Sequence, residues 1–214
     1  MQVILINGSP NKKGATSLAL SEVERTLNED GIETQNFWVG AKPISGCLGC
    51  GKCAKLGKCI IDDHVNEFRQ LAYSADGFVF GSPVHYSAIS GQLKSFMDRL
   101  FFSEFMGNKN KAFRLKPAAA VAVARRCGSA TAFSQMNKYF GIQEMYIVSS
   151  RYWNDVFALT PDEVSFDAEG LCNMRVLAHN MAYFLRLVEA GKASNIPLPK
   201  VEEPVFTNFH NKIG

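Results

Sequence analysis

Four of the six cysteines of the chain lie close together, at Cys47, Cys50, Cys53 and Cys59. The first three follow one another at three-residue steps, and the glycines among them permit the tight turns that would let their thiolates surround one centre. Four thiolates are the ligand set of iron–sulfur clusters and of closed structural zinc sites. The spacing therefore predicts a compact cluster such as [4Fe–4S], a structural zinc ion, or cysteines that remain free or form a surface disulfide.

A second chemical feature is the loop that follows the first apolar run, Val3 to Ile6. Residues 8–16 lead into a helical pattern, and the N–H groups at a helix start bind phosphate. The hydroxyls of Ser9, Thr16 and Ser17 add further donors. The loop lacks both the G-x-G-x-x-G fingerprint and the spacing and lysine of the P-loop. It therefore predicts a phosphate monoester bound without magnesium, or else simple capping of the helix by Thr16.

Apolar runs alternate with helical patterns along the chain, and continuous apolar runs predict strands buried on both faces. The expected strands cover residues 3–6, 32–39, 77–80, 118–124 and 145–148. The expected helices cover residues 16–29, 128–140 and 171–190, with two more following Asp62 or Asp63 and spanning Ile89 to Leu100. Residues 155–170 are expected to form a loop, and those from 194 an extended tail. This alternation predicts an α/β three-layer sandwich around a parallel sheet.

The loops 9–16, 82–87 and 125–128 would then lie at the carboxyl edge of the sheet, where ligands bind. Their sequences point to a family. Gly8-Ser9-Pro10 with Gly14, Thr16 and Leu18 resembles the first loop of the NAD(P)H-dependent FMN reductase branch of the flavodoxin-like superfamily. A stronger match is Gly81-Ser82-Pro83-Val84-His85-Tyr86, then Ser90-Gly91-Gln92-Leu93-Lys94 and Asp98-Arg99-Leu100. Ala124-Arg125-Arg126-Cys127-Gly128 is similar to the third flavin loop, and the resemblance extends to about Val148.

The resemblance implies a flavodoxin-like sandwich with a five-stranded parallel sheet and helices on both faces. The length and the order of elements predict one domain over residues 1–193, with a cysteine-rich insertion at 46–59 and an extended tail over 194–214, and the resemblance implies that this domain binds FMN. The residues implied to bind FMN are Ser9, Asn11, Gly14, Ala15, Thr16 and Ser17 at the phosphate, Pro83, Val84, His85 and Tyr86 at the isoalloxazine ring, and Ala124, Arg125, Arg126 and Gly128 at the pyrimidine side. The sequence departs from the family at Ala15, where Asn is common, and at His85, where an aromatic residue is common.

The cysteine spacing is similar to the motif of archaeal-type iron–sulfur flavoproteins, in which the cluster exchanges electrons with FMN. The resemblance thus implies an FMN-dependent oxidoreductase that passes electrons from NAD(P)H to an unidentified small-molecule or protein acceptor. The flavin carries the chemistry, so no catalytic protein residue is expected. The alternatives are an iron–sulfur flavoprotein in ferredoxin-linked electron transfer and a flavin-binding electron carrier without a substrate of its own. Lys94, Asp98 and Arg99 are expected to form mainly structural ion pairs, and Cys127 to be a small buried residue.

The composition narrows the class of protein further. The chain has 214 residues, 47% of them hydrophobic, and a net charge of +3 with no long basic run, so no nucleic-acid partner is expected. Its longest apolar run, Ala118 to Ala124, is far short of the roughly 20 residues of a membrane span. With no signal-like N-terminus, a cytoplasmic protein is expected. The aromatic residues Phe101, Phe102, Trp153, Phe206 and Phe209 predict a homodimer or homotetramer, in which Tyr152 or Trp153 completes the flavin pocket.

Overall fold

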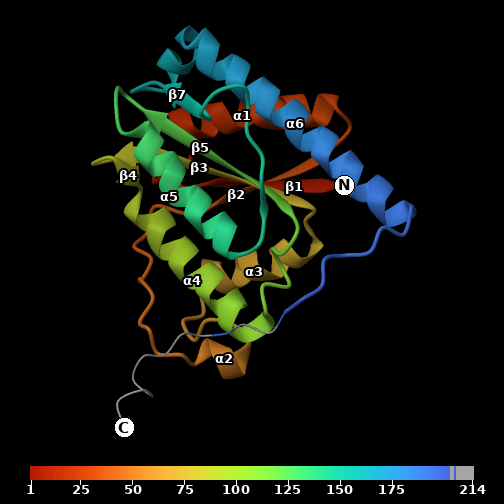
Figure 1. Ribbon diagram of the computed structural model, residues 1–214. Helices are drawn as coiled ribbons and strands as arrows, with labels where there is room; N and C mark the ends of the chain where they lie inside the picture. Colours follow the sequence, from red (N-terminus) through yellow and green to blue (C-terminus); the bar gives the residue numbers. More distant parts are fainter. Residues whose placement is uncertain (203–204, 206–214) are drawn as a thin grey trace.

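The computed structural model describes residues 1–202 and 205, and these build one twisted sheet with helices on both faces (Figure 1). The strand order is β2-β1-β3-β5-β6, and every pair along this path is parallel. The strands are β1 (Gln2–Asn7), β2 (Glu33–Trp38), β3 (Gly77–His85), β5 (Pro117–Ala124) and β6 (Tyr146–Ile147). The short strand β4 (Ala88–Ile89) turns back antiparallel to the end of β3. The expected α/β sandwich with a parallel sheet is confirmed.

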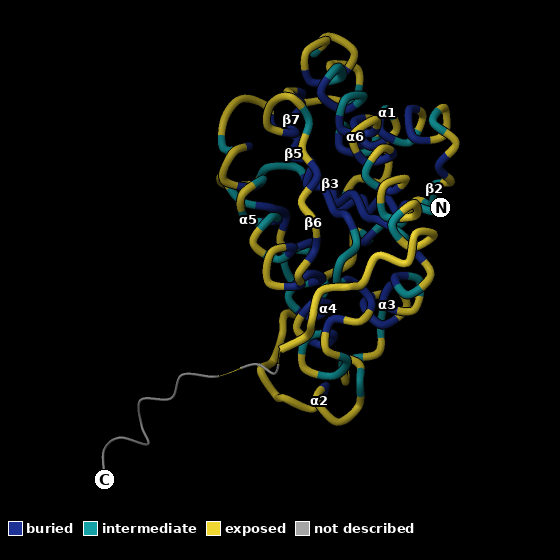
Figure 2. The backbone as a smooth tube through the Cα atoms, turned by 45° about the vertical axis from the view of Figure 1, so that its right-hand side comes forward, coloured by how far each residue is buried: buried dark blue, intermediate teal, exposed yellow. Residues whose placement is uncertain are grey.

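Two apolar layers hold the helices to the sheet. One lies beneath α1 (Ala15–Glu29) and α6 (Ala168–Ala193), and the other beneath α3 (His64–Ser74), α4 (Gly91–Asn108) and α5 (Ser129–Ile142) (Figure 1). Along β1, Val3 and Leu5 face the first layer, whereas Ile4 and Ile6 face the second. Because helices cover both faces of the sheet, apolar residues occupy every position from Val3 to Ile6 instead of alternating with polar ones. The central strands are accordingly the most buried part of the chain (Figure 2).

The fifth position of the sheet differs from the expectation. Only Tyr146–Ile147 of the predicted strand pairs with β5, and the position is completed by β7 (Asp155–Phe157), which pairs with the other end of β5. The prediction of a loop over 155–170 is therefore wrong, since this stretch also contains the 3₁₀ helix η1 (Asp162–Phe166) and the start of α6. Three residues are too few to show the hydrophobic alternation of a strand. β7 is therefore defined by its pairing with β5 and could not be recognised from the sequence.

Helix α4 begins later and ends later than expected. Ile89 belongs to β4, and the Ser90 hydroxyl caps the helix by accepting the Leu93 N–H at 3.2 Å. The helix then continues past Leu100 to Asn108. Asp63 is the residue that caps α3, accepting the Val65 N–H at 3.1 Å. Within the described residues, no helix has the length and apolar character that crossing a membrane requires. Phe206 and Phe209, expected at an interface, lie outside the described residues.

Candidate functional site

The first two predicted loops are joined by direct hydrogen bonds at the carboxyl edge of the sheet. The Gly8 N–H donates to the Gly81 carbonyl at 2.8 Å, and the Ser90 hydroxyl donates to the Gly8 carbonyl at 2.6 Å. A Cβ at Gly8 would lie 2.7 Å from a Leu93 methyl carbon and 2.9 Å from the Gly81 oxygen. Only glycine therefore allows this approach, and the two loops are held as one unit.

The start of α1 has the features of an anion site. Gly14 occupies the N-cap position without a side-chain hydrogen bond, and the first turn contains no acidic residue. The N–H groups of Ala15, Thr16 and Ser17 therefore stand at the positive end of the helix without a side-chain cap. Thr16 is buried and Ser17 is half-buried. This arrangement suits a phosphate better than it suits simple capping by Thr16, because the Thr16 side chain caps nothing here.

The preceding loop is folded by its own polar side chains. The Ser9 N–H donates to Asn7 Oδ1 at 3.0 Å, and the Asn11 N–H donates to Ser9 Oγ at 3.1 Å. Trp38, which was not predicted as a site residue, donates its indole N–H to the Ser9 carbonyl at 2.8 Å, and the Lys12 ammonium lies 5.6 Å from its ring centre. Trp38 ends β2 at the same edge of the sheet, which is the sequence signal that could have identified it.

The second loop is a tight hairpin. Val84 pairs with Ile89 and His85 with Ala88, and the turn residues Tyr86 and Ser87 have φ values of 50° and 61°. Pro83 and Val84 are half-buried, whereas His85 and Tyr86 are exposed. The hairpin thus presents an apolar edge beside two exposed rings, a surface that a planar ligand could cover.

The third loop packs directly against this hairpin. Gly128 has a φ of 90°, and a Cβ there would lie 2.8 Å from the Ser87 Cα atom. Ala124 is buried, while Arg125, Arg126 and Cys127 are exposed, so the expectation of a buried Cys127 is wrong. In residues 1–202, neither guanidinium of the loop has a hydrogen-bond or ion-pair partner, which leaves two cations at the edge of the site.

Asp155, another residue that was not predicted, links β7 to this loop. The Ser129 hydroxyl, at the first residue of α5, donates to Asp155 Oδ2 at 2.8 Å. Burial raises the pKa of Asp155, and the Ser129 hydrogen bond partly opposes that shift. The contact fixes the third loop to the edge of the sheet. The structure therefore brings the three predicted loops together. Ser90, which belongs to the second motif, supports them, as do Trp38 and Asp155, which sequence reasoning missed.

The four clustered cysteines line a single pocket beside α4. Cys53 is buried, Cys59 half-buried, and Cys47 and Cys50 exposed, and all four are free thiols. Burial raises the pKa of Cys53, and the neighbouring Cys47 and Cys50 add to the shift. The chain reverses at glycines 49, 51 and 57, each with a φ between 62° and 66°. In the described part of the chain no three metal-ligating side chains are already arranged around one point. The donor set and the turns nevertheless fit a four-thiolate group.

Arg99 closes the inner wall of this pocket. Its side chain is fully buried, and its guanidinium donates to both carboxylate oxygens of Asp63 at 2.7 and 2.9 Å. The Nε–H group donates to the Cys59 sulfur at 3.2 Å. The expectation of structural ion pairs on α4 is confirmed for Lys94 with Asp98, at 2.6 Å, and for Arg99 with a partner outside the helix.

Gly107 lets the cysteine segment approach α4. A Cβ at Gly107 would lie 2.7 Å from the Cys53 carbonyl oxygen and 2.8 Å from Gly57 Cα, both backbone atoms. We expect Gly107→Ala to lower the free energy of unfolding by about 1–3 kcal/mol, as measured by urea denaturation. Gly141→Ala is the matched control, since nothing lies within 4 Å of that position on α5, and it should stabilise by about 0.5–1 kcal/mol. Equal effects of the two substitutions would contradict the close approach.

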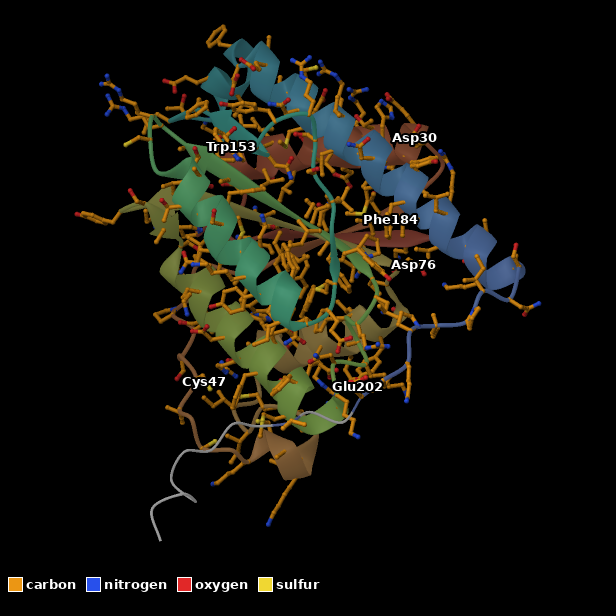
Figure 3. The ribbon with its side chains drawn as sticks, in the orientation of Figure 1. Asp30, Cys47, Asp76, Trp153, Phe184 and Glu202 are labelled. Atoms are coloured by element: carbon orange, nitrogen blue, oxygen red, sulfur yellow. The ribbon has the colours of Figure 1, made fainter. Side chains whose placement is uncertain are left out.

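The two sites lie at different heights along α4. The hairpin meets the helix at Ser90, while the cysteine pocket meets it at Arg99 and Phe102. At about 1.5 Å per residue, the stretch from Ser90 to Phe102 spans about 18 Å. Figure 3 shows the labelled Cys47 on the segment that runs beside α4 towards α2 (Cys53–Leu56), well away from Trp153.

The parallel sheet, its strand order and the loops at its carboxyl edge define a flavodoxin-like protein. Solved structures agree on the fold: RosB with bound 8-demethyl-8-formylriboflavin-5′-phosphate matches with a TM-score of 0.67 at 14% identity, over 98% of this chain and 92% of that one. A flavodoxin from the domain Archaea matches with a TM-score of 0.58 at 14% identity, over 87% and 99% of the two chains.

Sequence comparison assigns the family. Residues 1–159 match the model of the NADPH-dependent FMN reductase family, and the chain belongs to that family. It is also 33% identical over 197 residues to an iron–sulfur flavoprotein of Methanocaldococcus jannaschii, covering 88% of this chain and 100% of the relative. The protein is therefore a flavin-dependent oxidoreductase, as its loops predicted.

Proposed function

We propose that the protein binds FMN across its three joined loops, accepts electrons from NAD(P)H and passes them to a small-molecule or protein acceptor. The observation that carries this proposal is the meeting of the three loops at one edge of the sheet, the first two joined by hydrogen bonds and the third packed at Gly128 against Ser87. Bound FMN supplies the hydride chemistry at its N5 atom. The chain contributes binding and electrostatics, with no side chain acting as an acid or base on the flavin.

Each loop has a distinct role in this proposal. The uncapped start of α1 and the hydroxyls of Ser9, Thr16 and Ser17 bind the phosphate, while Asn11 and Gly14 shape the loop around it. The hairpin edge at Pro83 and Val84 contacts the ring, with His85 and Tyr86 at its rim. At the third loop the backbone after Ala124, with Arg125 or Arg126, lies at the pyrimidine side, where positive charge favours the anionic reduced flavin.

Steady-state kinetics test this function. Protein loaded with FMN is expected to oxidise NADPH or NADH in the presence of a quinone, a nitro compound, free flavin or ferric chelate. Protein stripped of FMN should show no activity, and adding FMN should restore it. Oxidation of neither nucleotide with any acceptor, despite bound FMN, would favour an electron carrier without a substrate of its own.

We further propose that Cys47, Cys50, Cys53 and Cys59 bind a [4Fe–4S] cluster. Support comes from the lining of one pocket by all four thiols and from the Arg99 N–H directed at the Cys59 sulfur. A zinc ion would use the same ligands, so iron and acid-labile sulfide must be measured together with zinc. The cluster would extend electron transfer to single-electron partners of the ferredoxin type.

Self-association is proposed through the groove between α4 and α5. Its lining is largely apolar, with Phe102, Phe105 and Ile142 beside Tyr139, and the exposed fraction of the Ile142 side chain is 64%. Exposed apolar surface of this kind favours contact with a second copy. Sedimentation is expected to show a dimer or tetramer, and Ile142→Glu to shift it towards monomer. Tyr183→Glu, at an equally exposed position on α6, is the control and should leave the assembly intact. A monomeric wild-type protein would contradict the proposal.

A further inference from the structure

We infer that Arg99 and Asp63 together set the reduction potential of the group held by the four cysteines, Arg99 raising it and Asp63 lowering it. The inference rests on the proposed cluster site and goes beyond it, because it assigns a function to two residues that are not ligands. Sequence spacing alone placed Arg99 among structural ion pairs.

The position of the guanidinium carries the first step. Arg99 uses every side of its planar group: Nε–H donates to Cys59 Sγ at 3.2 Å, the two terminal nitrogens donate to Asp63, and one of them also donates to the Ile61 carbonyl at 2.8 Å. The other terminal nitrogen reaches the Ser45 carbonyl at 3.4 Å. The group thus bridges the two ends of the cysteine segment and points one donor at a ligand sulfur.

Burial carries the second step. The Arg99 side chain is fully buried, so its charge acts on the pocket with little screening by water. An arginine stays protonated at all ordinary pH values. Aliphatic side chains could hold α4 to this segment as firmly, since a buried ion pair contributes little to stability on balance. A fixed cation and an N–H···S bond at a thiolate ligand are features that a purely structural contact does not need.

The consequence for redox chemistry follows from charge. One electron, supplied by the reduced flavin, adds negative charge that spreads onto the ligand sulfurs. Hydrogen bonds to those sulfurs and nearby net charge are known determinants of cluster potential. Arg99 stabilises the reduced state of the cluster through its hydrogen bond to the Cys59 sulfur and through its positive charge. Asp63, which is half-buried behind the guanidinium, opposes it. The two residues should therefore shift the potential in opposite directions.

The test is a redox titration of the reconstituted protein, followed by electron paramagnetic resonance. Asp63→Asn is expected to raise the midpoint potential, because it removes the negative charge that opposes reduction. Asparagine still caps α3 and still accepts a hydrogen bond from Arg99. The double variant Arg99→Gln with Asp63→Asn leaves no unpaired buried charge. It should favour the oxidised state about tenfold more than Asp63→Asn alone, which is about 59 mV for one electron. Lys94→Gln is the control. Lys94 carries a positive charge on the same helix but does not line the cysteine pocket, so its loss should leave the midpoint potential unchanged.

The inference is supported if the potential rises from the wild type to Asp63→Asn and falls from Asp63→Asn to the double variant. Equal potentials, or two shifts of the same sign, would overturn it. Wild-type protein that takes up no iron and sulfide would instead refute the cluster proposal, so the two failures are distinguishable. If the double variant does not fold, wild-type protein labelled with ¹⁵N-arginine provides an independent readout. Pulsed resonance of its reduced cluster should show coupling to an arginine nitrogen, and absence of that coupling would overturn the inference.

Discussion

Replacing Ser17 with aspartate is expected to weaken FMN binding about 100-fold. A carboxylate in the first turn of α1 would stand where the phosphate is proposed to bind. At an effective dielectric constant of about 20, two unit charges about 5 Å apart repel by about 3 kcal/mol, and each 1.4 kcal/mol is a factor of ten in affinity. Titration of the apoprotein with FMN, followed by quenching of flavin fluorescence, measures the loss.

The same substitution should stabilise the apoprotein. An acidic side chain at the start of a helix is favourable by about 0.5 kcal/mol, and α1 has none in its first turn. Opposite effects on affinity and on stability would therefore identify the start of α1 as the phosphate site. Ser17→Asn is the matched control of similar size without charge, and it should cost less than about tenfold in affinity. An unchanged affinity in Ser17→Asp would place the phosphate elsewhere.

Substituting Cys53 with serine is expected to reduce bound iron and sulfide to background after anaerobic reconstitution. Cys53 is the most buried of the four thiols and lies at the start of α2, so its loss removes the innermost ligand. Flavin content should stay the same, because the three loops lie elsewhere on the fold. Elemental analysis, sulfide assay and the flavin absorbance of the same sample provide the measurement.

Cys127→Ser is the control for this experiment. Cys127 is exposed in the third loop and does not line the cysteine pocket, so iron and sulfide should be retained. Full iron content in Cys53→Ser would contradict a four-cysteine site. Loss of iron together with loss of FMN would instead indicate that the variant is misfolded.

The central strands and the loops at their ends could be predicted because their signals are local. The runs at Val3 to Ile6 and Ala118 to Ala124 are apolar on both faces, and each of the three loops carries its own motif. Whether the predicted side chains contact FMN stays a prediction. The same is true of a cluster at the four cysteines and of a domain boundary near residue 193.

The remainder depended on contacts between distant parts of the chain. Pairing with β5 places Asp155–Phe157 in the sheet, although three residues are too few to show the alternating hydrophobic pattern of a strand. The bond from Arg99 to Cys59 joins residues forty positions apart, and Trp38 reaches Ser9 from the neighbouring strand. The prediction that Cys127 is buried was wrong for a related reason. Its apolar character suggested burial, whereas the turn at Gly128 carries the loop outward over the hairpin.

The visible absorbance spectrum of protein purified without oxygen tests the proposed cofactors most directly. Resolved flavin bands above a broad absorbance that bleaches on reduction are the expected result, since they report FMN and a cluster in one sample. Flavin bands alone, with no iron or sulfide after reconstitution, would contradict the cluster and leave the NAD(P)H-dependent flavin reductase. A colourless protein that remains colourless after FMN is added would contradict the proposed binding site at all three loops.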